Sequence, residues 1–216
     1  MSVRRQSPLF WALLILIALI ALFPYAWIVL TSFKARSDIL TTPPVWIHQP
    51  SWTNYRNMLF ERGFDRYLLN SIIIGLSSTM LALLVGTLAA YAFSHYRIPA
   101  GNHLFFYILA TRLGPPVAYA LPMYFLFSEL GLLGTHLGVI LAHTTFNLVL
   151  VVWMMKTYFD EIPVEVEEAA RLDGCSEWQI FSRISAPLAG PGLVTAAIFI
   201  FIFSWNEFSP SSPSGI

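Results

Sequence analysis

The sequence has little charge. Lys, Arg, Asp and Glu make up 11% of its 216 residues and balance to a formal net charge of zero, whereas a soluble domain carries roughly 25% charged residues. Hydrophobic residues make up 56% of the chain. Four stretches longer than the ~20 residues that cross a bilayer lack these charged types altogether: residues 6–33, 67–96, 130–155 and 184–206. This composition argues against a soluble globular protein and predicts a chain whose main solvent is lipid.

Several functional motifs are also missing. Cys175 is the single cysteine, so no internal disulfide and no cysteine-based metal or redox motif can form. No Gly-x-x-x-x-Gly-Lys-Ser/Thr run is present to hold the phosphates of ATP, and no Gly-x-Ser-x-Gly motif indicates a hydrolase. Lys and Arg form no stripe that would follow a nucleic-acid backbone. We therefore predict no catalytic residue, no metal site and no nucleic-acid partner, and any energy must come from another subunit.

The hydrophobic pattern predicts an all-α, polytopic bundle of transmembrane helices. A further apolar stretch, at about 104–127, contains one charged residue, Arg112. The Gly-Pro-Pro run that follows Arg112 predicts a kinked or locally unwound helix. The first stretch is too long for the apolar region of a signal peptide, so we take it as a retained helix. Five spans are expected, at about 9–30, 67–93, 104–127, 138–155 and 187–205.

Two further features concern packing. The loop at 31–66 is polar and rich in proline, and it should contain a short helix near 52–60. Ala82, Gly86 and Ala90 follow one another at four-residue spacing in the second span. This spacing puts three small residues on one face and predicts that another helix approaches closely there.

Residues 156–187 carry ten of the chain's 24 charged residues and predict two short helices outside the membrane. Asp160 or Glu161 could cap the first helix, and Gly174 should end it as a left-handed residue. Ser176 and Gln179 form a capping box for the second helix, which Pro187 should stop. The ordinary interpretation of such a segment is a solvated loop that reconnects two spans.

A specific pattern in this segment favours another interpretation. Glu168-Ala169-Ala170, then Gly174, Ile184 and Pro187 at their spacings, resembles the EAA loop of permeases in binding-protein-dependent ABC importers. Ala186 departs from the family pattern, which usually has Leu. The resemblance implies a cytoplasmic element that docks on an ATP-binding subunit and passes its closure to the membrane helices. The residues that it assigns to this coupling are Glu168, Ala169, Ala170, Asp173, Gly174, Ile184 and Pro187.

Other motifs resemble the maltose/maltodextrin-type, carbohydrate-uptake branch of the family. They include Pro-Ser-Trp-Thr-Asn-Tyr at 50–55 and Ser-Trp-Asn-Glu-Phe at 204–208. The resemblance implies import of a sugar, oligosaccharide or polyol, with another solute such as an amino acid, peptide or oxyanion as the alternative. It also implies ABC ATPase subunits that bind ATP and Mg, a second homologous permease, an extracytoplasmic solute-binding protein and a place in the bacterial inner membrane.

The resemblance also sets expectations for topology and length. With the coupling loop in the cytoplasm, counting helices back along the chain puts the N-terminus there too. The distribution of Lys and Arg does not decide the orientation, because it is almost even between the two sides. The family has six spans, whereas residues 209–216 are small and polar after a permease domain at 1–208. We therefore expect a C-terminally truncated or frame-shifted chain with a disordered tail, and a form without transport activity stays an alternative.

Candidate residues for a solute path are Arg112, Thr144 and Asn147. An arginine in a span usually faces a cavity, a partner or the interface, because exposure to lipid is costly. Polar side chains at membrane depth join helices to one another as often as they meet a solute. Two other classes remain open at this point, an intramembrane hydrolase and a non-catalytic assembly factor, although no motif supports either.

Overall fold

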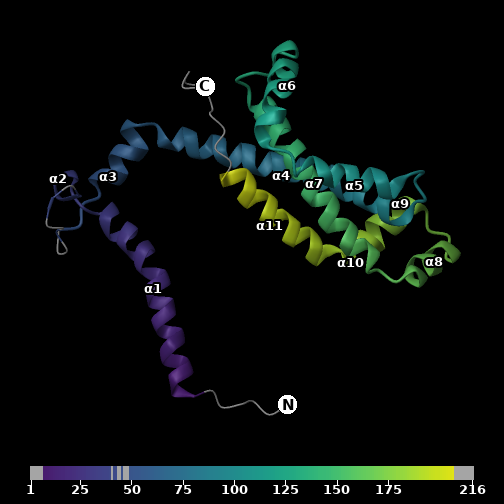
Figure 1. The fold of residues 1–216 in the computed structure, drawn as a ribbon, viewed down its shortest axis with the longest axis horizontal. Coiled ribbons are helices and arrows are strands. Elements are labelled where there is room, and N and C mark those ends of the chain that lie inside the picture. The colour runs from purple at the N-terminus through teal and green to yellow at the C-terminus, as the bar shows by residue number, and fades with distance from the viewer. Residues whose placement is uncertain (1–6, 40, 43–44, 46–48, 207–216) are drawn as a thin grey trace. The chain divides into compact units, whose positions relative to one another are not determined.

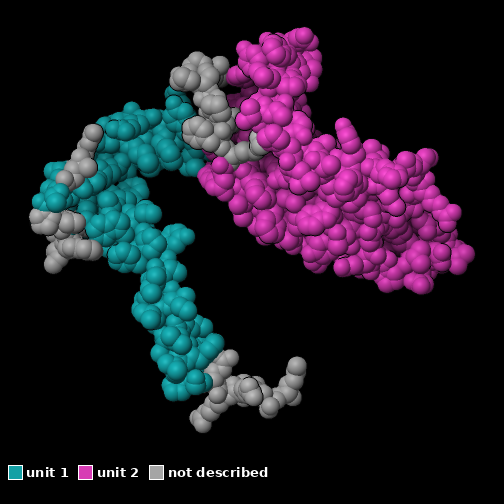
Figure 2. All heavy atoms as spheres, viewed as in Figure 1, with its two compact units in different colours: residues 1–68 teal, residues 69–216 magenta. Residues whose placement is uncertain are grey.

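The structure, a computed structural model, describes residues 7–39, 41–42, 45 and 49–206, and within these residues every regular element is a helix. The order of the helices along the chain can be followed in Figure 1. The chain divides into two compact units, residues 1–68 and 69–216 (Figure 2). The predicted all-α class is confirmed. The predicted tail at 209–216 lies outside the described residues.

The first unit is built around α1, Pro8–Ser32, which covers the predicted span at 9–30. Ser7 caps its start, where the side-chain oxygen accepts a hydrogen bond from the backbone N–H of Phe10 at 3.3 Å. None of the residues of α1 is buried. A helix that is apolar on every side is typical of a membrane span, because lipid can then surround it.

The loop after α1 folds back onto the end of that helix. It contains a short helix, α2 Arg36–Ile39, and the helix expected near 52–60 is present as α3 Thr53–Arg56 and the π-helical turn η1 Asn57–Glu61. The side-chain amide of Asn54 donates to the backbone carbonyls of Ser32 at 3.0 Å and Lys34 at 2.6 Å. The last carbonyls of a helix lack partners within it. Asn54 supplies partners at this end and fixes α3 against α1.

The second unit has its core between three long helices: α4 Phe64–His95, α7 His136–Asp160 and α11 Gly190–Asn206. These helices run side by side in Figure 1. α4 begins in the last residues of the first unit. The buried apolar cluster of the second unit consists of residues of α4, α7 and α11 and the residue before α11: Ala82, Ala90, Tyr91, Val151, Met155, Phe159, Ala189, Ala196 and Ile200.

Glycines allow the helices of this core to approach closely. A β-carbon at Gly86 on α4 would lie 2.6 Å from the side chain of Val151 on α7, and one at Gly192 on α11 would lie 2.4 Å from the ring of Tyr158. Ala82 and Ala90, on the same face as Gly86, are completely buried. The close approach predicted from the spacing of these three residues is confirmed.

The predicted span at 104–127 is divided in the structure. α5, Gly101–Thr111, and α6, Pro116–Glu129, are separate helices of 11 and 14 residues. Pro115 and Pro116 supply no backbone N–H to continue α5, so the break predicted at the Gly-Pro-Pro run is confirmed. Among the described residues, α1, α4 and α7 are long and apolar enough to cross a membrane, and a fourth span results if the bent pair at 177–206 counts as one. This number is lower than the five spans expected from the sequence, because α5 and α6 are each too short to cross alone.

Replacing Gly86 with alanine should loosen the contact between α4 and α7. We expect Gly86→Ala to lower the thermal stability of the purified protein by about 1–3 kcal/mol, since the new methyl group overlaps Val151. Gly190→Ala, at the first residue of α11, is the control for an added methyl group, because a β-carbon at Gly190 meets no atom within 4 Å. Equal melting temperatures for the two variants would contradict this account of the interface.

Candidate functional site

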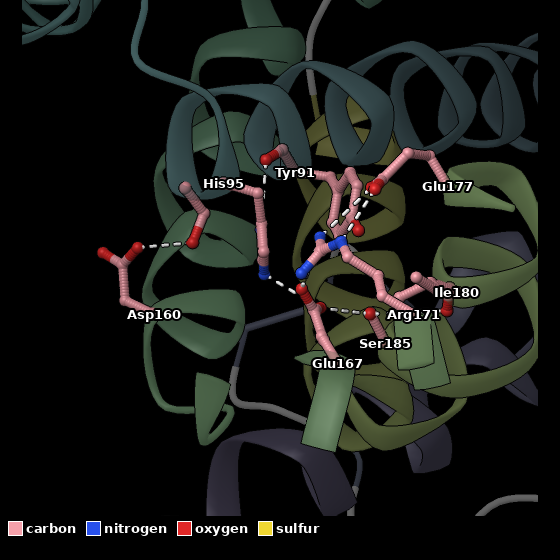
Figure 3. Close-up of polar contacts among 9 residues, drawn as sticks. Tyr91, His95, Asp160, Glu167, Arg171, Glu177, Ile180 and Ser185 are labelled. Atoms are coloured by element: carbon pink, nitrogen blue, oxygen red, sulfur yellow. Dashed lines mark hydrogen bonds and ion pairs between the residues drawn. The ribbon is translucent and has the colours of Figure 1, made fainter. Parts of the chain in front are cut away.

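The segment predicted to couple to an ATPase forms a compact helical element, which we call the coupling segment (residues 164–188). Its parts are α8 Val164–Leu172, α9 Glu177–Ile180, the π-helical turn η2 Phe181–Ser185 and α10 Ala186–Leu188. The helix-turn-helix expected there is present. In Figure 3, residues of this segment lie against the last turns of α4 and α7.

The start of α8 differs from the prediction. Asp160 or Glu161 was expected to cap it, but α7 continues to Asp160, and Pro163 occupies the N-cap without a side-chain hydrogen bond. The carboxylate of Asp160 is engaged elsewhere, by the ammonium of Lys156 and the hydroxyl of Ser94, both at 2.6 Å. It therefore ties the end of α7 to the end of α4.

The turn between α8 and α9 follows the prediction closely. Gly174 has a φ of +85°, in the left-handed region that glycine adopts without strain. The capping box is complete, because Gln179 N donates to Ser176 Oγ at 3.3 Å and Ser176 N donates to Gln179 Oε1 at 2.8 Å. These local bonds define the start of the second helix.

An exposed ion pair closes the same turn. Arg171 on α8 donates to both carboxylate oxygens of Glu177 on α9, from Nε at 2.8 Å and from a terminal nitrogen at 3.2 Å. These hydrogen bonds lower the pKa of Glu177 below its ordinary value and raise the pKa of Arg171. A carboxyl whose pKa is lowered by folding stabilises the fold above its unfolded pKa, and this contribution is lost as the pH falls through the folded value.

Pro187 was predicted to stop the second helix, and this prediction is wrong. The chain remains helical through Pro187 to Leu188, and the break comes at Ala189, where residues 177–188 and 190–206 meet at a bend of 72°. A proline lacks the N–H of a regular helix and its ring clashes with the preceding turn. The π-helical turn η2 immediately before α10 changes the register there, and such local adjustments are a common way to accommodate proline.

Glu167 is the residue that sequence reasoning missed. Its side chain is 1% exposed, and Oε1 accepts a hydrogen bond from Ser185 Oγ at 2.5 Å and contacts His95 Nε2 at 2.9 Å. Arg171 lies 3.7 Å from Oε2. Removing one partner from a buried ion pair costs about 3–5 kcal/mol, so these contacts constrain three elements strongly. The available signal was helical spacing, because Glu167 lies three residues before Ala170, the other buried residue of α8.

His95 meets this carboxylate from the last turn of α4, as Figure 3 shows. Its ring stacks on Tyr91 with a centroid distance of 4.2 Å, and Nδ1 lies 3.2 Å from the backbone carbonyl of Tyr91. Both ring nitrogens thus face oxygens that accept hydrogen bonds.

The residues assigned to coupling lie mostly on the outside of the segment. Ala170 is buried and Ile184 is half-buried, and the others are exposed: Glu168, Ala169, Asp173, Gly174 and Pro187. Two large apolar side chains share this exposure, Leu172 at 89% and Trp178 at 64%. The segment therefore presents carboxylates and apolar anchors outward, an arrangement that suits a protein partner.

Arg112, predicted as a solute-path residue, lies in the break between α5 and α6. Its guanidinium donates to the backbone carbonyl of Phe146 on α7 at 2.6 Å and lies 5.6 Å from the ring centroid of Phe203 on α11. The side chain is nevertheless exposed. These contacts join helices, and a contact with solute stays a prediction.

Asn147 and Thr144 take part in contacts between helices. Asn147 is 2% exposed, and its amide donates to the hydroxyl of Ser204 on α11 at 2.9 Å; Ser78 on α4 donates to the same hydroxyl at 3.2 Å. Thr144 donates to the carbonyl of Ile140 within α7 at 2.7 Å and, at 3.5 Å, to the carbonyl of Ser78 on α4. A polar cluster of Ser78, Asn147 and Ser204 therefore connects the three core helices, and a solute role for Asn147 and Thr144 stays a prediction.

A surface pocket of about 390 Å³ lies at the turn between α4 and α5. Its lining includes the basic side chains of Arg97, His103 and Lys156 and none of the predicted solute-path residues. Within the part of the chain that the structure describes, no group of three or more His, Cys, Asp or Glu residues could hold a metal ion.

Comparisons with known proteins agree on one family. A family model described as "Binding-protein-dependent transport system inner membrane component" matches residues 82–212. A probable ABC transporter permease of Sinorhizobium fredii is 37% identical over 93% of this chain and 71% of its own length. The permease of a diacetylchitobiose uptake system of Streptomyces coelicolor is 34% identical over 96% of this chain and 68% of its own length. The permease of a trehalose transport system of Mycobacterium tuberculosis is 36% identical over 96% of this chain and 75% of its own length.

A solved structure is also similar. It is a crystal structure of a bacterial ABC transporter involved in the import of the acidic polysaccharide alginate. The TM-score is 0.76 at 27% sequence identity, and the match covers 92% of this chain and 70% of the other.

The left-handed turn at Gly174 gives a testable prediction. A β-carbon there would meet no atom within 4 Å, so Gly174→Ala should act only through backbone strain of about 1–2 kcal/mol. Gly174→Asn should cost less, because asparagine tolerates this conformation. Hydrogen exchange of the backbone amides at 173–175 would report the loosening. Faster exchange in the asparagine variant than in the alanine variant would contradict it.

Proposed function

The chain belongs to the binding-protein-dependent transport system inner membrane components, and we propose that it is the membrane-spanning subunit of an importer for a sugar, oligosaccharide or polyol. In this proposal an extracytoplasmic binding protein delivers the solute, and separate ATPase subunits bind ATP and Mg and supply the energy. The chain itself is a permease component and not an enzyme. Its place is the bacterial inner membrane.

One observation carries the proposal. The family match at 82–212 includes the whole coupling segment, and this segment presents a carboxylate, Glu168, beside exposed apolar side chains, Leu172 and Trp178. Apolar anchors supply most of the binding energy of a protein interface, whereas charges set its register. We infer that this face docks on an ATPase subunit and that Glu168 meets a basic group there.

The proposed solute class is supported by relatives with different cargoes. Those named above serve diacetylchitobiose and trehalose uptake, and another, of Agrobacterium fabrum, belongs to a sulfoquinovosyl glycerol transport system and is 32% identical over 87% of this chain. All three cargoes carry sugar rings with several hydroxyl groups. A carbohydrate or polyol is the class that these relatives have in common.

The proposed orientation places the coupling segment in the cytoplasm. The last turn of α4 contacts this segment through His95, and the end of α7 leads into it. Both of these helix ends then face the cytoplasm, and counting back along the chain puts the N-terminus there as well. In this proposal a second permease chain of the same family completes the path.

Reversing the charge of Glu168 should weaken the ATPase complex. We expect Glu168→Lys to lower the amount of ATPase that co-purifies with the permease by tenfold or more, as a lost interfacial ion pair of about 2–5 kcal/mol implies. Glu129→Lys, an equally exposed glutamate at the end of α6, is the matched control and should leave the yield unchanged. Wild-type yields for both variants would remove the basis for the proposed docking face.

The solute class can be tested by reconstitution. The chain, co-expressed with its partner permease and ATPases, would be placed in vesicles with the binding protein of the same system. Trehalose, diacetylchitobiose and alginate oligosaccharides would be offered in parallel with an amino acid, a dipeptide and sulfate. We expect ATP-dependent uptake from the carbohydrate set, because its members offer the hydroxyl groups of the relatives' cargoes. Uptake from the other set alone would assign this importer to a different solute.

A further inference from the structure

Two neighbouring glutamates of α8 have opposite surroundings. Glu167 is 1% exposed, whereas Glu168 is exposed and forms no hydrogen bond or ion pair with the described residues. Successive residues of an α-helix point about 100° apart, so adjacent side chains can serve different partners. One carboxylate is bound inside the protein and the next is free to meet another subunit.

We propose that Glu167 is a positioning residue that transmits movement of the coupling segment to α4. The inference rests on the proposed function, because the movement comes from an ATPase docked on the outer face of the segment. Glu168 would serve the partner, and Glu167 would connect the segment to the membrane helices. Neither carboxylate reacts chemically in this role.

The contacts of Glu167 place it between the segment and α4. Its Oε1 contacts His95 Nε2 at 2.9 Å and accepts the hydrogen bond from Ser185 at 2.5 Å. His95 belongs to the last turn of α4, Glu167 to α8 and Ser185 to η2, and the three meet in Figure 3. A displacement of the segment therefore pulls on α4 through directional bonds, whose geometry tolerates little change.

α4 is suited to carry such a displacement. It is one continuous helix of 32 residues. It contains no proline, which is a common cause of a sharp kink. Ser78, whose hydroxyl donates to Ser204 on α11, lies on the same helix as His95 and about 25 Å from it at 1.5 Å per residue. Movement applied at His95 can thus reach the contact between α4 and α11.

The chemistry of Glu167 favours positioning over simple filling of space. Apolar residues of similar volume often stabilise a core as well as a buried ion pair does, or better. A buried ion pair fixes the register of its partners, because it forms only in one arrangement. At Glu167 the partners come from two other elements, which is the arrangement that a transmitting contact requires.

The test uses the assembled importer in lipid vesicles with two spin labels. The labels are placed by Val166→Cys in α8, which is exposed but lies off the face of Glu168 and Leu172, and by Leu84→Cys in α4, which is also exposed, in a Cys175→Ser background. The distance between them is measured by pulsed electron resonance without nucleotide and with ATP and vanadate. In the wild-type background the segment and α4 should move together, so that ATP leaves this distance unchanged. In Glu167→Gln the ATP state should show a changed distance, while the nucleotide-free distance keeps its wild-type value and width; the thermal transition should fall, because a buried charged partner is lost.

Two matched variants complete the experiment. His95→Phe keeps a ring that can stack on Tyr91 but removes the donor, and it should reproduce the effect of Glu167→Gln. Glu168→Gln should reduce ATPase retention and leave the nucleotide-free distance unchanged. Wild-type distances in both states of Glu167→Gln would overturn the inference, and so would a broadened nucleotide-free distance, which indicates a folding role only. If no ATPase is retained even by the wild-type chain, the proposed function itself fails and this inference with it.

Discussion

The contact between Glu167 and His95 is the interaction on which the arrangement of the second unit depends. A carboxylate that is 1% exposed is stable only with partners that replace its hydration. Ser185, His95 and Arg171 supply these partners from different parts of the chain. Glu167 therefore holds α8 to α4 through polar contacts, and the ring contact of Tyr91 with Phe181 adds an apolar one between α4 and the coupling segment. The Asp160 contacts to Ser94 and Lys156 hold the neighbouring helix ends in the same way.

Local signals in the sequence predict the local structure well. The capping box of Ser176 and Gln179, the left-handed glycine at 174 and the break at the Gly-Pro-Pro run are all present, because each depends on residues a few positions apart. The buried small residues of α4 follow from helical spacing in the same manner. The family follows from a pattern of residues at fixed spacing, which a match over most of the chain bears out.

Long-range contacts account for what the sequence does not predict. Glu167 and His95 are far apart in the chain, and nothing near either residue indicates the other. Asp160 was expected to cap α8, but it binds Ser94 of α4 instead, so a tertiary contact replaced a local one. Pro187 was expected to end a helix, and a π-helical turn accommodates it. In each case the local preference is worth about 1–3 kcal/mol, which packing in a folded core can outweigh.

Because α4 is long, a small tilt at one end displaces residues near its middle by a large distance. A tilt of 5° about His95 would move Ser78 sideways by about 2 Å, given the separation of about 25 Å between them. The bond between Ser78 and Ser204 is 3.2 Å long, and hydrogen bonds weaken steeply once donor and acceptor separate much further. A small rotation at the surface of the membrane would thus be enough to break a polar contact in its interior, so that the bundle would respond as a switch with a threshold and not as a spring.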